Sequence, residues 1–201
     1  MKRDIESIKR NLEDKQNNDI IYKKHKLEEM FYEDPDLLEI LGKKSKRPLN
    51  KYINPQNPTT EELEERKQIL EYNKRIDLPQ IIPYLKLNGI QKDTRNFIMF
   101  DIADKGISYT NKMIKNQVLI VWCLVHEDNM DTEYEIPRTD LLSYIVKDLL
   151  SWSNFLGMQL MPGKDNPDIA DGRYYCRTLE FSIEAPNHAH TGGTNIHDRI
   201  M

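Results

Sequence analysis

Hydrophobic residues in the first part of the chain recur at helical spacing between charged ones. The positions that follow this spacing are Ile5, Ile8, Leu12, Ile20, Ile21, Leu27, Met30 and Phe31. Asp34 and Pro35 then suit the N-cap and first position of another helix, and Gly42 suits its C-terminal stop. The pattern predicts a helical N-terminal arm over residues 1–42.

The helical pattern is interrupted at residues 43–58. This segment opens with a basic run and continues with prolines among few apolar residues, which predicts a linker. The basic residues are Lys43, Lys44, Lys46 and Arg47. Residues 59–80 predict another helix, because acidic residues fill its first turn, where the helix dipole favours them.

From about residue 81 onward the periodicity indicates strands. Residues 96–103 and 115–126 are rich in β-forming residues, and residues 173–185 alternate cleanly between apolar and polar positions. The centre of the second strand, Val118–Val125, is apolar on both faces and therefore has to be covered on both sides. We expect one cover from within the chain, and either a helix or a neighbouring subunit as the other.

An amphipathic helix is predicted to start at Pro137, with Thr139 or Asp140 as its cap. Its apolar positions form one continuous stripe from Leu141 to Leu150. Beyond it, residues 157–161 predict a short strand and residues 162–172 a polar loop.

These elements predict an α+β fold in which a mixed or antiparallel β-sheet packs on one amphipathic helix. The α+β core domain spans residues 81–185. The helical arm, the linker and the helix of residues 59–80 form an N-terminal extension, and residues 186–201 form an extended, flexible C-terminal tail.

Charge is unevenly distributed along the 201 residues. Residues 1–78 are balanced, whereas residues 79–201 contain 12 Lys and Arg against 16 Asp and Glu, which accounts for the whole net charge of −4. An acidic core domain argues against a DNA-binding face, because phosphate binding needs a local surplus of positive charge. We expect a soluble protein of a reducing cytoplasm, with Cys123 and Cys176 as buried thiols, no signal peptide and no membrane span.

Motifs for catalysis are scarce. The sequence contains no phosphate-binding glycine loop and no nucleophile elbow. The sharpest metal candidates are His188 and His190, but we expect this terminal segment to dock on a partner, because a metal site needs a rigid shell. The acidic residues after His126 are interpreted as a solvated turn. We therefore expect no catalytic residues, no cofactor and no metal.

Several residues are candidates for contacts with a partner or another copy. The strand start at Arg173, Tyr174, Tyr175 and Arg177 combines the side chains that protein interfaces favour, although its aromatic residues would equally suit the core. The basic run at residues 43–47 suits docking on a protein or on DNA passing nearby, or simply a solvated linker. Arg138 suits an ion pair with a neighbour or with the nearby acidic turn.

Residues 96–185 resemble the tail-terminator and neck proteins of tailed bacteriophages. The resemblance is carried by the apolar strand QVLIVWCLVHED, the helix RTDLLSYIVKDLL with Trp152 and Gly157 soon after it, and the strand that begins RYYCRTLEF. It implies a virion protein whose copies form a ring, hexameric or dodecameric, that caps the tail tube and joins it to the head. Its partners would be itself, the tail tube and portal-associated neck proteins, with DNA passing nearby and no membrane.

Three other hypotheses compete with a tail terminator. One is a head-completion or adaptor protein bound to the portal ring. Another, from a different class, is a small metal-dependent nuclease or hydrolase that uses His188 and His190. A DNA-binding regulator is disfavoured by the net charge and by the lack of a basic recognition helix.

Overall fold

A computed structural model describes residues 19–42, 60, 64, 67–68, 70–71, 80–85, 94–154, 156, 159–170 and 172–187. Its helices are α2 (Asp19–Glu33), α3 (Pro35–Ile40), the short 3-10 helix η1 (Glu127–Asn129) and α5 (Arg138–Leu150). Its strands are β1 (Ile81–Ile82), β2 (Phe97–Ile107), β3 (Ile114–His126), β4 (Leu160–Ala170) and β5 (Tyr174–Pro186). The predicted α+β class is confirmed. No helix among the described residues has the length and apolar character needed to cross a membrane.

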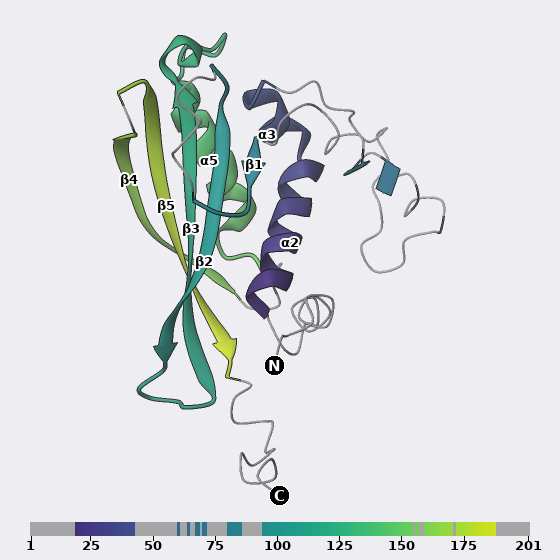
Figure 1. The fold of residues 1–201 in the computed structure, drawn as a ribbon, viewed down its shortest axis with the longest axis vertical. Coiled ribbons are helices and arrows are strands. Elements are labelled where there is room, and N and C mark those ends of the chain that lie inside the picture. Colours follow the sequence, from purple (N-terminus) through teal and green to yellow (C-terminus); the bar gives the residue numbers. More distant parts are fainter. Residues whose placement is uncertain are drawn as a thin grey trace, which may run out of the picture.

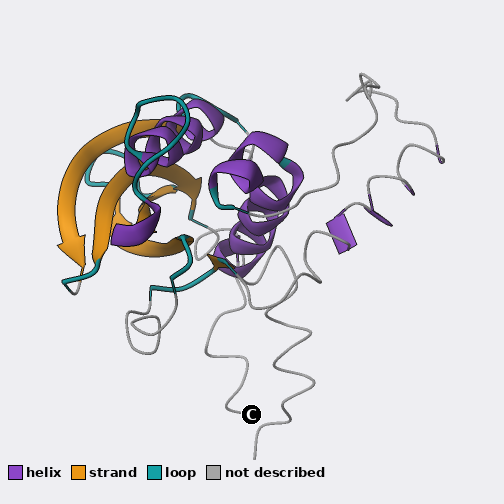
Figure 2. Cartoon of the chain, turned by 90° about the horizontal axis from the view of Figure 1, so that it is seen from above, coloured by secondary structure: helices purple, strands orange, loops and turns teal. Residues whose placement is uncertain are grey.

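The five strands form one sheet in the order β1-β2-β3-β5-β4, in which only the β1–β2 pair is parallel (Figure 1). Seen from above, the sheet is strongly curved and the helices stand beside it (Figure 2). α5 packs on β3, β4 and β5, whereas α2 packs on β1 and β2. The sheet is therefore mixed, as expected, but a second helix, α2, shares the predicted role of α5, and α3 packs against both helices.

The main core lies between these helices and one face of the sheet. Leu27 and Phe31 of α2 are fully buried there, as the helical stripe predicted. The ring of Phe31 meets that of Phe100 edge-on, with centroids 5.6 Å apart. Edge-on packing is a favourable geometry for two aromatic rings. The arm helix α2 is thus an integral part of the core.

The other face of β3 is covered by a second, smaller cluster. Leu124 is 1% exposed and packs there with residues of β1, β2 and β5. Those residues are Ile82, Phe97, Met99, Tyr174 and Cys176. Along Val118–Val125 only Ile120 and Trp122 are partly exposed. Helices therefore cover one face of this strand, as one of the two expected alternatives held, and the second cluster covers the other face from within the chain.

Two strands run further than the sequence predicted. β2 continues through Gly106 to Ile107 by pairing with β3, across a bulge between Asp104 and Gly106. β4 extends to Ala170 through the segment expected to be a polar loop, because its backbone pairs with β5. Prolines at positions 162 and 167 are tolerated because β4 is an edge strand, whose outer N–H groups need no partner. Side-chain patterns do not report this backbone pairing.

Helix ends follow the predictions in one case and not in the other. Asp34 caps α3: its Oδ1 accepts a hydrogen bond from the Leu37 N–H at 2.7 Å, and Gly42 follows with φ of +80°. The predicted cap of α5 is wrong, because Pro137 is the N-cap and no side chain caps the helix. Thr139 is buried and Asp140 pairs with another residue instead.

Part of the predicted N-terminal extension and tail lies outside the described residues, namely residues 1–18, 43–58 and 188–201. Of residues 59–80, those described before Gln80 are assigned to a helix. At the other end, Pro186 still belongs to β5 and Asn187 is buried, so the expected tail does not begin at residue 186.

Candidate interaction surfaces

The lower parts of β2, β3 and β5 project beyond the helices, at one end of the long axis of the molecule (Figure 1). We call residues 103–117 and 184–187 the projecting extension. The three strands remain paired along it, with Ile107 opposite Lys115 and Ile114 opposite Pro186. Every residue from Ala103 to Ile107 is exposed. The extension is thus a sheet segment held by backbone pairing, with little core of its own.

The turn at the end of the extension, residues 107–113, is held by specific hydrogen bonds. The Ser108 N–H donates to the Ile114 carbonyl at 2.8 Å, and the Met113 N–H donates to Asn111 Oδ1 at 3.0 Å. Asn187 closes it from β5, donating its N–H to the Met113 carbonyl at 2.7 Å and its side-chain amide to the Lys112 carbonyl at 3.0 Å. We call this turn the tip.

Apolar side chains project from the tip into solvent. Tyr109 is fully exposed (104%), and Ile107 and Met113 are about half exposed (50% and 51%). A single exposed hydrophobic residue is ordinary, but three of them within one ordered turn of seven residues concentrate apolar surface at one end of the molecule. Because the turn is already ordered, a partner that binds it would not have to fix its backbone.

A polar chain fixes the base of the extension to α2. The buried Lys23 donates through Nζ to Gln117 Oε1 at 2.5 Å, and Gln117 donates through Nε2 to Asp104 Oδ1 at 2.7 Å. Next to it, Lys24 Nζ lies 2.5 Å from Asp101 Oδ1. A buried amine needs such acceptors, since its desolvation is otherwise costly. These contacts set the direction in which the extension leaves the body.

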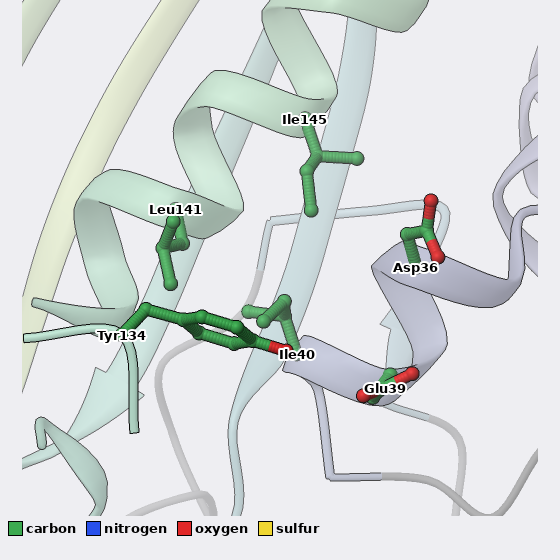
Figure 3. A pocket seen from close by; sticks show the side chains of 6 residues that line it. All are labelled: Asp36, Glu39, Ile40, Tyr134, Leu141 and Ile145. Atoms are coloured by element: carbon green, nitrogen blue, oxygen red, sulfur yellow. The ribbon is translucent and has the colours of Figure 1, made fainter. Parts of the chain in front are cut away.

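A groove lies between α3 and α5, toward the opposite end of the long axis. It encloses a cavity of about 240 Å³. Its lining residues are Asp36, Glu39, Ile40, Tyr134, Leu141 and Ile145. In Figure 3 the ring of Tyr134 lies beneath Leu141 and points toward Ile40, while the two acids stand on α3 at the rim. We call this the α3–α5 groove.

The rim of the groove is negatively charged. The carboxylate of Glu133 raises the pKa of the Tyr134 phenol, both by its charge and by a hydrogen bond, and the charges of Glu39 and Asp36 add to the effect. The negative charges of these carboxylates disfavour ionisation of the phenol. The groove therefore combines an apolar floor with a rim that favours a hydrogen-bond donor or a cation.

Arg138, a predicted contact residue, holds one end of this groove together within the chain. Its guanidinium donates to the carbonyls of Ile40 at 2.8 Å, Asn129 at 2.7 Å and Asp131 at 3.3 Å. The first bond satisfies a carbonyl at the C-terminal end of α3, where helical partners are missing. Arg138 thus joins the acidic turn, as one interpretation held, but through backbone carbonyls.

Arg177, another predicted contact residue, lies in an ion-pair cluster between α5 and the β4–β5 edge. Its Nε donates to Asp165 Oδ1 at 2.6 Å, and its Nη1 pairs with Asp140. Lys147 donates to the other oxygen of Asp165, also at 2.6 Å. Partial burial raises the pKa of the Asp165 carboxyl, but the bonds from Arg177 and Lys147 outweigh it and hold that pKa below its ordinary value.

The other residues of the predicted strand-start contact differ in exposure. Tyr174 is buried and packs against the rings of Phe97 and His126, with centroids 6.2 and 5.1 Å away. Arg173 is exposed, with Glu127 3.9 Å away. Tyr175 is partly exposed opposite Ile169, which is also exposed. Of this set, Arg173 and Tyr175 are the exposed residues.

The remaining predicted sites lie outside the described residues. These are Lys43, Lys44, Lys46, Arg47, His188 and His190. Within the described ranges, no three His, Cys, Asp or Glu side chains are grouped so as to hold a metal ion. Cys123 and Cys176 are free and buried, as predicted. Burial raises the pKa of both thiols, that of Cys176 to about 11, so that they stay protonated near neutral pH.

The tip and the groove were not among the sites predicted from the sequence. A tyrosine flanked by small polar residues, in the segment Ser108–Lys112 between two strands, was the available signal for the tip. No sequence signal reveals the groove, because α3 and α5 are about 100 residues apart and meet only through folding.

A family model described as YomW matches residues 34–183, well over half of the chain. The match includes α3, α5, the tip and most of the sheet. No curated protein and no solved structure matches the chain. The chain therefore belongs to the YomW family, a family of phage-associated proteins.

Proposed function

We propose that this protein is a structural virion component of a tailed bacteriophage at the head–tail interface, where its copies form a ring that terminates the tail tube and joins it to the head. The observation that carries the proposal is the ordered, apolar tip of the projecting extension. A turn held by backbone and side-chain hydrogen bonds, with Tyr109 fully exposed, suits a contact with another protein.

Membership of a phage-associated family supports a role in the phage, and the resemblance of residues 96–185 to tail-terminator and neck proteins supports its place in the particle. A non-enzymatic role fits the contacts of the polar and nucleophilic side chains described above. Arg138 and Arg177 are engaged in contacts within the chain, and both thiols are buried, so these groups serve the fold.

Deletion of the gene from the phage tests the proposal. Loss of a terminator leaves tail-tube growth unchecked, so electron microscopy of the lysate should show tails of irregular, excessive length and heads without tails. Labelled protein should be found at the junction of head and tail in complete particles. Complete particles with attached tails of normal length after the deletion would contradict the proposal.

The same experiment separates the terminator from its nearest alternative. An adaptor bound to the portal acts on the head, so its loss should leave tails of normal length that are detached from DNA-filled heads. Ring symmetry in the particle gives a second criterion, since a tail ring is expected to be six-fold and a portal-bound ring twelve-fold.

A further inference from the structure

We propose that the tip of one copy docks in the α3–α5 groove of a second copy, with Tyr109 as the residue that enters the groove. This inference rests on the proposed function, because it names the contact that would build the ring. The tip and groove lie toward opposite ends of the long axis of one molecule (Figure 1). A contact between them therefore joins two copies.

The size of the groove favours a side chain as its occupant. Its cavity of about 240 Å³ is smaller than the roughly 300–1,000 Å³ of typical small-molecule sites. The floor made by Ile40, Leu141 and Ile145 offers aliphatic contacts to one aromatic ring. The ring of Tyr134 at the edge of the groove adds an aromatic surface to this aliphatic floor.

The chemistry of the two surfaces is complementary. Tyr109 pairs an apolar ring with a phenol that can donate a hydrogen bond, and the rim offers the carboxylates of Asp36 and Glu39 as acceptors. The tip also contains Lys112, a cation, and no acidic residue. The raised pKa of Tyr134 reports the negative field that this cation would meet. Tyrosine is also a frequent anchor residue in protein interfaces.

A contact between two different surfaces of the same chain has a defined consequence for assembly. Each copy offers one tip and one groove. Two copies that fill each other's groove would form a closed two-fold dimer, whereas copies that each fill the groove of the next form a heterologous series. The proposed ring requires the series. Such a chain of contacts closes into a ring when the rotation between neighbours permits it. Together with the proposed ring, the inference predicts a cyclic oligomer whose neighbouring copies are not related by a two-fold axis, and a closed two-fold dimer would contradict it.

Mixing two variants tests the pairing directly. Tyr109→Ala removes the anchor and leaves the groove intact, whereas Ile145→Lys places a charge on the groove floor and leaves the tip intact. Sedimentation of the wild type should show concentration-dependent oligomers, and each variant alone should associate at least about tenfold more weakly. Mixed in equal amounts, the two variants should form a one-to-one heterodimer and nothing larger, since only one intact tip and one intact groove meet.

Charge reversal gives a second arm that leaves the groove floor intact. Lys112→Glu and Glu39→Lys should each weaken association, and the double variant carrying both should recover it. Tyr144→Ala is the matched control, because Tyr144 is 66% exposed on α5 and does not line the groove. Circular dichroism melting curves confirm that each variant folds.

Three further outcomes would overturn the inference. If the Tyr109→Ala variant oligomerises as strongly as the wild type, the copies meet through other surfaces, and the proposed ring is left intact. A mixture of the two variants that stays monomeric would show that tip and groove are not partners. A monomeric wild type whose Tyr109→Ala variant fails to enter particles would assign the tip to a different protein. The gene-deletion phenotype tests the proposed function independently of all three.

Discussion

β2, β3 and β5 each pass through two regions, the packed body and the projecting extension, and their side chains change character between the two. In the body, β3 is apolar on both faces and almost fully buried. In the extension the same strands present Lys105, Ile107 and Glu184 to solvent. The body is therefore stabilised mainly by hydrophobic burial, whereas the extension is maintained by backbone pairing and by its polar attachment to α2.

This difference separates the residues that stabilise the fold from those that are available for contact with a partner. Truncation of a side chain in the body should lower the free energy of unfolding, whereas truncation of an exposed side chain in the tip should change it little. A protein that keeps apolar residues where they add little stability has them available for a partner. The following substitutions test this separation, from the largest expected effect to the smallest.

Phe100→Ala should have the largest effect on the free energy of unfolding. Phe100 is fully buried and touches Phe31, so its removal leaves a cavity between α2 and the sheet. We expect a loss of about 3–5 kcal/mol, measured by urea denaturation. Tyr109→Ala on the tip should change the same quantity by less than about 0.5 kcal/mol. A large loss from Tyr109→Ala would show that the extension contributes to the core.

Arg177→Ala should have the next largest effect, because it leaves Asp165 and Asp140 without their shared cation. We expect a loss of about 1.5–3 kcal/mol, the range for hydrogen bonds to charged groups in partly buried sites. Arg173→Ala is the matched control: its nearest acid is 3.9 Å away at an exposed site, so the loss should stay below about 1 kcal/mol. Equal losses would contradict the role of the cluster.

The same cluster should make stability sensitive to acid. The folded pKa of Asp165 lies below its ordinary value of 3.8, so folding favours the ionised carboxyl. The resulting stabilisation is fully present above pH 3.8 and is lost as the pH falls through the lower folded pKa. Asp165→Asn should remove this part of the pH dependence, measured by urea titrations from neutral to acidic pH. An unchanged slope in the variant would contradict the assignment.

Arg138→Ala should have a smaller and more local effect. It removes the bond to the Ile40 carbonyl, which holds the end of α3 against the acidic turn. We expect a loss of about 1 kcal/mol in global stability and faster hydrogen exchange in α3. Arg138→Met, which keeps much of the aliphatic stem, serves as the control for lost packing. Unchanged exchange in α3 would show that Arg138 does not position the groove.

Gly106→Ala should lower global stability about as little as Arg138→Ala does, and its effect should arise in the extension. Gly106 has φ of +101° beside the bulge of β2, a conformation that residues with a Cβ adopt only under strain. The free energy of unfolding should fall by about 1 kcal/mol. No atom lies within 4 Å of the added Cβ, so the backbone alone carries this cost. Lys105→Ala, at the preceding position, should be neutral in the same assay.

The sequence by itself determined the elements whose side chains repeat with a clear period. The stripe from Ile20 to Phe31 is the buried side of α2, and the alternation in β5 separates Leu179 and Phe181 in the core from Ser182 in solvent. Asp34 and Gly42 marked the ends of α3 because capping is a local interaction. Such features depend on neighbours a few positions apart, which a single chain segment contains.

Only the tertiary structure decided what depends on distant partners. The stripe of α5 looked continuous, yet Leu142, Val146 and Leu150 are buried while Leu141 and Ile145 line the groove, because α3 approaches that side. β4 is a strand because its backbone pairs with β5, and both faces of β3 are covered by residues of the same chain. Backbone pairing leaves no periodic trace in either segment, and a hydrophobic stripe does not say which remote segment will pack against it. The groove and the projecting extension therefore emerge only when the chain is folded.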